Sequence, residues 1–207
     1  MSKPKKSYHR PNLEESLIAK AAEIIASRGV EALSLRELGR CAEVSRTAPY
    51  HYFPDKAALL FKVGELGFRR LGERIVREIG DTPLSLRQLR SGLRGYVLFA
   101  LEDEHLFRLM FANVLRRDVL MTQPVQGPTL LFSSESAQQT FALLLDGILR
   151  LQQEGMLRPA DPGLLLNVLW AYSHGVAVLA LDRNLKHDDD MAVLDAGLDA
   201  LLAAYAA

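Results

Sequence analysis

Cysteine is nearly missing from this sequence, because the 207 residues contain only Cys41. A single cysteine excludes an intramolecular disulfide framework and any metal site built on a C-x-x-C pair. Val, Ile and Thr are sparse, and no alternating run of apolar and polar residues is long enough to predict a strand. Ala and Leu dominate, and 49% of the residues are hydrophobic. The composition therefore predicts an all-α protein that can bury a sizeable core.

An apolar leader is also missing, since Met1 is followed by Ser-Lys-Pro-Lys-Lys. We therefore expect no signal peptide and a cytoplasmic protein. The longest apolar run covers about residues 164–181 and contains Asn167, Ser173 and His174. Its length approaches that of a membrane span, but we interpret it as a buried core or interface helix, so no membrane partner is expected.

Motifs of catalysis or metal binding are absent as well. The five histidines do not form H-E-x-x-H or another metal spacing, and the serines at 133–136 have no G-x-S-x-G frame. The acidic run Asp188–Asp190 is interpreted as a solvated helix start rather than a cation site. The sequence thus predicts no catalytic residue, no metal and no cofactor, and the protein is not expected to be an enzyme.

The net charge is zero, but the charge is unevenly distributed. Residues 1–80 carry 15 Lys and Arg against 10 Asp and Glu, and residues 81–207 carry 10 against 15. A basic front end on an acidic body indicates an anionic partner for the front end. A chance fluctuation of surface charge is the alternative explanation.

Apolar periodicity and capping signals predict about nine helices, with Gly29 and Gly155 as natural stops after two of them. The predicted helices cover about residues 12–28, 34–41, 45–52, 55–79, 83–101, 102–114, 133–154, 161–181 and 188–206. Asn12, Thr82 and Asp161 are the expected N-caps of three of these helices. The segment from Thr122 to Pro128 is expected to be a loop.

Two of the predicted helices are short and joined by a tight turn. Ser34 and Glu37 form an S-x-x-E capping box at the start of the first, and Ser45 can cap the second. A turn of three residues, 42–44, separates them. Gly39 lies where a side chain would obstruct the approach of the following helix. The segment therefore reads as a helix-turn-helix.

The segment from Ser34 to Leu60 closely resembles the DNA-binding signature of the TetR family. The resemblance lies in Val44-Ser45, in the run Tyr50–Lys56 and in Leu59-Leu60. About nine helices in some 200 residues also match that family, and Trp170…His174-Gly175 resembles the Trp…His-Gly signature of one subgroup's ligand domain. The resemblance implies a dimeric, ligand-responsive repressor that binds a near-palindromic DNA operator. It implies three parts: a flexible basic arm (1–11), a DNA-binding domain (12–60) and a ligand-binding and dimerisation domain (61–207).

Two residues depart from the family pattern. Glu43 occupies a turn position where the family usually has Gly, and a left-handed backbone there would strain Glu by roughly 1 kcal/mol. Pro49 removes an amide from the recognition helix, so this helix is expected to bend.

A recognition helix hides an apolar back and exposes donors to DNA. Val44, Pro49 and Phe53 suit the back, whereas Arg46 suits a guanine edge and the Thr47 methyl suits thymine. Tyr50 and His51 suit phosphates or base edges. The resemblance assigns phosphate contacts to Tyr52 and Lys56 and an occasional base contact to Arg36. The predicted DNA-binding residues are Arg36, Ser45, Arg46, Thr47, Tyr50, His51, Tyr52 and Lys56. Taken singly, the cations also fit a solvated surface, and the tyrosines also fit a core.

Aromatic and apolar residues of the C-terminal part are candidates for a small-molecule pocket, which would suit a hydrophobic effector. The predicted ligand-binding residues are Phe99, Phe107, Met110, Phe111, Phe141, Leu144, Trp170 and His174. Each of the apolar members also fits an ordinary core, and His174 also fits a buried hydrogen bond. Arg108 or Asn113 is a further candidate for a polar anchor.

The last two predicted helices are apolar on more than one face. Burial on two sides predicts a homodimer interface beside the internal core, and in the resembled family two such helices from each subunit usually build it. A fully internal helix is the alternative. For the whole chain, the alternative function is a helical ligand-binding or interaction protein without DNA binding. Salt-sensitive retention on DNA distinguishes the two functions, because phosphate contacts release counterions.

Overall fold

The computed structural model describes residues 13–81, 83–111, 134–185 and 189–207, and these form two compact units, Met1–Val63 and Gly64–Ala207. The regular structure of the described residues is helical throughout, apart from one isolated bridge between Leu157 and Ala206. The all-α prediction is therefore confirmed. The predicted arm (1–11), the cap Asn12, the cap Thr82 and the loop at 122–128 lie outside the described residues.

The first unit is built from α1 (Leu13–Arg28), the 3₁₀ helix η1 (Val30–Ala32), α2 (Leu35–Cys41), the 3₁₀ helix η2 (Ala48–His51) and the start of α3. The predicted N-cap of α2 is confirmed, because the Ser34 hydroxyl accepts the Glu37 amide at 3.1 Å, but the Glu37 carboxylate bonds Arg40 and Arg28 and does not complete a capping box. Gly29 ends α1 with a φ of 78°, as its position predicted. The core of this unit is aliphatic with one aromatic ring, and its members include Leu17, Ile25, Leu33, Leu38, Phe53 and Leu59.

The predicted third helix, 45–52, is wrong in type and length. Only Ala48–His51 is helical, and it is a 3₁₀ helix. An α-helix starting at Ser45 needs its first bond from the amide of residue 49 to the Ser45 carbonyl, and Pro49 has no amide. The Ala48 amide bonds that carbonyl instead, at 3.0 Å, and this tightens the turn into 3₁₀ geometry.

The close packing of α2 and η2 involves the two special positions that the sequence indicated, Glu43 in the turn and Gly39 on α2. Glu43 has a φ of 54°, so a residue with a full side chain occupies left-handed backbone. A Cβ built on Gly39 would lie 3.0 Å from the Ser45 carbonyl oxygen and 3.3 Å from Arg46 Cα. Both neighbours are backbone atoms, so the close approach of the η2 segment to α2 requires glycine at this position.

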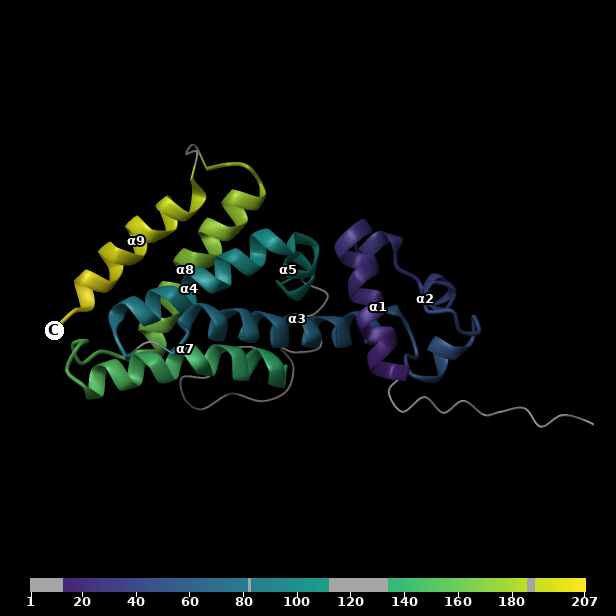
Figure 1. Ribbon diagram of the computed structural model, residues 1–207, viewed down its shortest axis with the longest axis horizontal. Coiled ribbons are helices and arrows are strands. Elements are labelled where there is room, and N and C mark those ends of the chain that lie inside the picture. Colours follow the sequence, from purple (N-terminus) through teal and green to yellow (C-terminus); the bar gives the residue numbers. More distant parts are fainter. Residues whose placement is uncertain (1–12, 82, 112–133, 186–188) are drawn as a thin grey trace, which may run out of the picture. The chain divides into compact units, whose positions relative to one another are not determined.

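The second unit contains most of α3 (Lys56–Ile79) together with α4 (Leu86–Glu102), α5 (Glu104–Phe111), α7 (Glu135–Gln153), α8 (Pro162–Leu181) and α9 (Asp190–Tyr205) (Figure 1). Asp161 caps α8 through the Leu164 amide, as predicted. The predicted start at Pro83 is wrong, because α4 begins three residues later, at Leu86, with Ser85 as its N-cap. Serine is the better cap here since its hydroxyl reaches the Gln88 amide at 3.2 Å.

Helix α8 is the centre of this unit and contacts α4, α7 and α9. It is also long and apolar enough to cross a membrane by length and composition alone, a test that core helices of soluble proteins also pass. Its inward residues Leu165, Leu169, Ser173 and Ala177 are buried in the unit. The arrangement therefore matches the interpretation of residues 164–181 as a core helix.

Helix α9 is held to α4 and α8 by polar contacts as well as by its leucines. Arg90 of α4 bonds Asp199 at 2.6 Å, and Arg94, one turn later, pairs with Asp195. From α8, the Tyr172 hydroxyl donates to the Val193 carbonyl at 2.6 Å. These contacts fix the register of α9 against its neighbours.

Candidate functional site

A ridge of polar side chains lies on the outer side of the first unit. Six of its members, Ser45, Arg46, Thr47, Tyr50, His51 and Tyr52, come from the turn and η2, and all are exposed. Tyr50 and Tyr52 are 49% and 41% exposed, so neither is the core aromatic that the sequence left open. Pro49 and Phe53 are buried behind them. Arg36, on α2, is exposed as well.

Ser45 stabilises the backbone turn that carries the ridge. Its hydroxyl accepts the Ala48 amide at 3.1 Å and lies 3.2 Å from the Thr47 hydroxyl. Ser45 therefore caps the turn 45–48 but is not the N-cap of η2, which is Thr47, so the predicted cap of a helix starting at Ser45 is wrong. Arg46 lies between these two residues, so its backbone is fixed while its side chain reaches outward.

Lys56 differs from the other predicted DNA-contacting residues because it is half-buried. Its Nζ donates to the Val30 carbonyl of η1 at 2.9 Å. An ammonium group has three donors, so this bond uses one of them. Lys56 therefore ties the first turn of α3 to η1, a role that sequence reasoning missed because the two residues are 26 positions apart.

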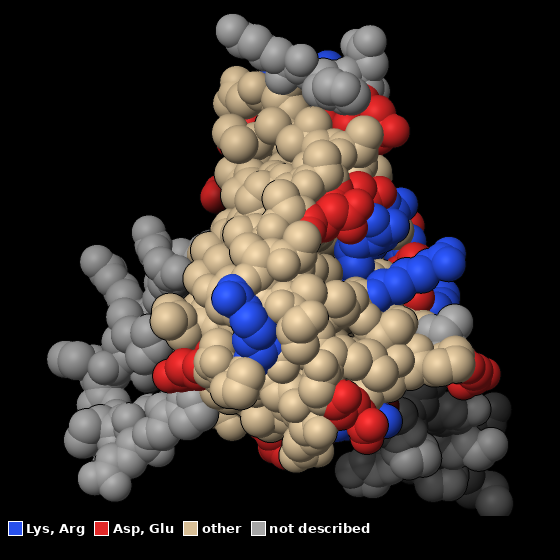
Figure 2. Space-filling model, turned by 90° about the vertical axis from the view of Figure 1, so that its left-hand side faces the viewer, with Lys and Arg blue, Asp and Glu red and all other residues tan. Residues whose placement is uncertain are grey.

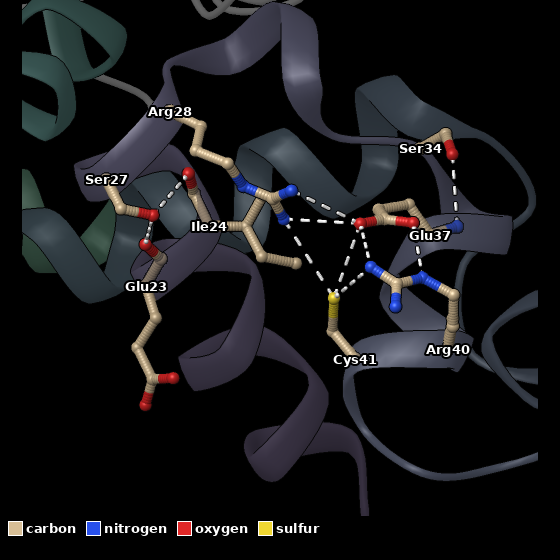
Figure 3. A network of polar contacts seen from close by, with 8 residues as sticks. All are labelled: Glu23, Ile24, Ser27, Arg28, Ser34, Glu37, Arg40 and Cys41. Carbon is tan, nitrogen blue, oxygen red and sulfur yellow. Dashed lines mark hydrogen bonds and ion pairs between the residues drawn. The ribbon is translucent and has the colours of Figure 1, made fainter.

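A second polar cluster on this unit, around Glu37, was also missed by the sequence analysis (Figure 3). The Glu37 carboxylate accepts two bonds from Arg40, at 2.7 and 2.9 Å, and further bonds from Arg28 at 3.3 Å. The Cys41 thiol lies 3.5 Å from the same carboxylate. The bonds from Arg40 are the main reason why the pKa of Glu37 is lowered from 4.5 to about 2. This cluster joins the end of α1 to α2.

In the second unit, five of the eight predicted effector contacts share one aromatic cluster. It contains Phe107 and Phe111 of α5, Phe141 of α7, and Trp170 and His174 of α8. The centroid of the His174 ring lies 4.9 Å from that of Phe111 and 5.5 Å from that of Phe107. Phe141 meets Trp170 edge-on, with 5.2 Å between the ring centroids. The spacing of these rings is that of packed aromatic side chains.

Tyr96 of α4 is the centre of this cluster, and the sequence analysis did not single it out. Its ring is 1% exposed and packs edge-on against Phe107 at 5.6 Å. The Trp170 Nε1–H donates to its hydroxyl at 3.1 Å, and the hydroxyl lies 2.7 Å from His174 Nδ1. Burial raises the pKa of Tyr96, so the hydroxyl keeps its proton.

The direction of these two bonds follows from counting protons. The Tyr96 oxygen already accepts the Trp170 proton, and its own proton needs an acceptor within reach. His174 Nδ1 lies within reach as that acceptor, and this arrangement requires the His174 tautomer that carries its proton on Nε2. The buried hydrogen bond that the sequence offered as one use of His174 is therefore present.

The remaining predicted effector contacts lie outside this set of ring contacts. Phe99 is buried on α4, and the Met110 sulfur fills the space beside Gly67, where a Cβ would come within 2.6 Å of it. Leu144 lines a separate small hollow with Leu89 and six other residues. Arg108, a candidate anchor, pairs with Glu104 and Asp182, and Asn113 lies outside the described residues. Among the described residues, no group of three His, Cys, Asp or Glu side chains is arranged to hold a metal ion.

Comparison with known families gives two matches that together span most of the chain. Residues 17–63 match a model described as bacterial regulatory proteins, tetR family, and residues 89–204 match one described as a tetracyclin repressor-like C-terminal domain. The likeness to the Trp…His-Gly subgroup stays a prediction, because neither description names that subgroup. A comparison with curated proteins found no matching sequence.

Solved structures with the same fold were also found. A protein of unknown function from Rhodococcus sp. RHA1 is 28% identical, with 98% of this chain and 100% of that one covered and a TM-score of 0.78. SmeT, the repressor of the Stenotrophomonas maltophilia multidrug efflux pump SmeDEF, is 25% identical over 93% and 90% of the chains, with a TM-score of 0.61. A TetR family transcription regulator from Marinobacter aquaeolei VT8 is 16% identical over 93% and 94%, with a TM-score of 0.64.

Proposed function

The chain belongs to the tetR family of bacterial regulatory proteins, and on this basis we propose that it represses transcription as an operator-bound homodimer that a hydrophobic effector releases. Membership of the family makes it a DNA-binding, ligand-responsive transcription regulator and not an enzyme. Repression, dimerisation and the form of the operator are the proposed parts. Repression is supported by the likeness to SmeT, which is itself described as a repressor.

The observation that carries the DNA-binding proposal is the exposed ridge on a buried apolar back. Arg46 has the planar fork that bonds guanine bidentately, and the Thr47 methyl is suited to thymine. Tyr50, His51 and Tyr52 add donors beside them, all exposed to solvent. Arg36 and Lys56 flank the ridge from α2 and α3. We propose that the ridge enters the major groove and that Lys56 and Tyr52 contact phosphates.

We also propose that the chain divides into the three parts that the sequence predicted. Residues 12–60 form the DNA-binding domain, preceded by a basic arm at residues 1–11 that contacts the DNA backbone. Residues 61–207 bind the effector and dimerise. A regulator of this kind acts on DNA in the cytoplasm, and this is the proposed location.

The proposed dimer interface is the outer face of α8 and α9. On α8, Leu164 and Leu179 are 60% and 43% exposed, and the outward positions of α9 include Ala192, Ala196 and Ala203. Figure 2, which faces the end where α9 terminates, shows a largely uncharged surface that a Lys or Arg side chain interrupts and that further charged side chains border. Apolar residues exposed on two adjacent helices favour pairing with a second copy, as expected for a closed two-fold dimer.

The proposed effector site is the aromatic cluster around Tyr96. Its rings offer apolar surface, and the hydrogen-bonded chain from Trp170 through Tyr96 to His174 supplies the few polar groups that orient a ligand. We therefore propose a small, largely hydrophobic effector. Because binding is reciprocal, an effector that weakens operator binding must itself bind more weakly to the operator complex by the same factor.

Selection of bound sequences from a random double-stranded DNA pool tests the proposal. A two-fold dimer with one ridge per subunit predicts a near-palindromic site whose half-sites lie about 34–36 Å apart, one helical turn. The matched control is a variant with Arg46 and Tyr50 replaced by Ala, which should enrich no site. An asymmetric single half-site as the full preferred sequence would count against the dimer. No enrichment by the wild type would favour the alternative of an interaction protein without DNA binding.

A further inference from the structure

Tyr172 of α8 reaches the backbone of α9 at a position where only glycine leaves room for it. Its hydroxyl donates to the Val193 carbonyl at 2.6 Å, and burial raises the pKa of Tyr172, so the hydroxyl keeps its proton. A Cβ built on Gly197, one turn later, would overlap the Tyr172 hydroxyl oxygen and Cζ and would lie 2.7 Å from Cε1. A rigid ring cannot bend away from such an overlap. Any other residue at position 197 must therefore separate the two helices or expel the ring.

The other sides of α9 are also held in place. Two arginines of α4 hold one flank through Asp195 and Asp199, and helical periodicity puts these aspartates about half a turn around the helix from Gly197. Between the two flanks, buried leucines face inward: Leu194, Leu198 and Leu202. Helix α9 is therefore fixed on three sides. Its fourth side carries an exposed row of small side chains, Ala192, Ala196 and Ala203.

The exposed row lies on the helix next to the exposed Leu164 and Leu179 of α8; Figure 1 shows α9 beside α8 in the second unit. The core of a protein interface is packed as densely as a protein interior. Moving α9 away from α8 by the width of one methyl group would therefore open voids in any interface that both helices form. The distance between α8 and α9, which the contact at Gly197 sets, thus determines whether the two helices present one continuous face.

We infer that Tyr172 and Gly197 are positioning residues for the homodimer: the missing side chain at position 197 lets Tyr172 hold α9 against α8 at the distance that pairing with a second copy requires. This inference rests on the proposed function, of which it uses only the dimer and neither the DNA nor the effector. Neither residue is assigned a contact with the second copy, so both act through the placement of α9. The alternative is that the pair only stabilises each subunit.

Sedimentation of the fluorescently labelled full chain, free of DNA and diluted over a wide concentration range, measures the dissociation constant of the dimer. Gly197→Ala adds one methyl group at the contact, Tyr172→Leu removes the ring that this methyl group meets, and the double variant combines the two changes. Gly147→Ala is the matched control, because it adds the same methyl group to α7, where a built Cβ lies an ordinary 3.9 Å from Leu89 Cδ1. Circular dichroism establishes that each variant is folded at the temperature of the measurement.

We expect Gly197→Ala to weaken the wild-type dimer by about tenfold or more, and to change Kd by less than about twofold when residue 172 is already Leu. Gly147→Ala should leave Kd within about twofold of the wild type. Because Ala is the better helix former, Gly197→Ala should lower the Tm of the wild type but raise that of Tyr172→Leu.

A role confined to subunit stability gives this pattern in Tm and leaves Kd unchanged, and that result overturns the inference. Equal weakening by Gly197→Ala in both backgrounds overturns it as well, because the effect is then independent of the ring. In both cases the wild-type dimer stands. A wild type that stays monomeric at every concentration overturns the proposed dimer and the inference with it.

Discussion

Replacing Tyr96 by Phe removes one oxygen from the centre of the aromatic cluster and leaves the ring in place. That oxygen accepts the Trp170 indole proton at 3.1 Å and donates to His174 Nδ1 at 2.7 Å. The substitution therefore deletes two hydrogen bonds at a site that is 1% exposed, where water has little access. Ring packing against Phe107 is retained, so the variant isolates the polar contribution.

Each hydrogen bond of this kind contributes about 0.5–1.5 kcal/mol net, so two contribute about 1–3 kcal/mol. Phe also avoids the cost of burying a hydroxyl, which reduces the loss, whereas Trp170 and His174 each lose this partner, which increases it. We expect Tyr96→Phe to lower the free energy of unfolding by about 2 kcal/mol. In a chain of this length that corresponds to a fall of roughly 4–8 °C in Tm.

The chain has one tryptophan, so the fluorescence of Trp170 reports on this cluster directly. Urea unfolding followed by that fluorescence gives the free energy for the wild type, for Tyr96→Phe and for Tyr50→Phe, whose hydroxyl lies on an exposed residue. Tyr50→Phe should be within about 0.5 kcal/mol of the wild type. A loss in Tyr96→Phe no larger than that of the control would refute the reasoning. So would nitrogen NMR shifts that place the His174 proton on Nδ1.

Three further outcomes follow from the first unit. Glu43→Gly relieves left-handed backbone that costs about 1–2 kcal/mol, but glycine adds about 0.5–1 kcal/mol of conformational entropy cost on folding. Thermal unfolding should therefore show a free energy of unfolding that is higher by about 0.5–1 kcal/mol. A lower Tm would argue against strain in the turn. The pKa of Glu37 is lowered to about 2, so its contribution to stability is present above about pH 4.5 and is lost as the pH falls toward 2. Urea unfolding at pH 5 and pH 2.5 should show a smaller loss in Glu37→Gln than in the wild type, and equal losses would remove Glu37 from the account. Lys56→Ala should weaken binding to all DNA similarly and flatten the salt dependence by about one unit, as measured by anisotropy titrations at several salt concentrations; an unaltered slope would confine Lys56 to its bond with the Val30 carbonyl.

Features set by local chemistry were predictable from the sequence. The Ser34 and Asp161 caps and the glycine stops at 29 and 155 depend on residues within one turn of each other. The need for Gly39 was also visible, because a tight turn brings the following segment back onto α2. Such signals suffice for the order of the helices and for the outer ridge.

Features that depend on distant partners were not predictable. Tyr96 reads as one more apolar position of an amphipathic helix until α8 places Trp170 and His174 beside its hydroxyl. Lys56 reads as a solvated cation until the Val30 carbonyl comes within 2.9 Å. The 3₁₀ form of the 45–52 segment is a different kind of miss, since Pro49 was recognised and only its effect on the first helical bond was underestimated.

The most direct test of the DNA-binding account is the affinity of Arg46→Ala for the selected operator and for a scrambled duplex of equal length, at one fixed salt concentration. If Arg46 reads a base from the exposed ridge, its loss costs about 1–3 kcal/mol on the operator, roughly a 5- to 150-fold weaker Kd. Binding to the scrambled duplex should weaken far less, because the substitution removes only a phosphate contact or general charge there. Equal losses on the two duplexes, or a wild type that binds both equally, would contradict the claim that this ridge reads DNA sequence.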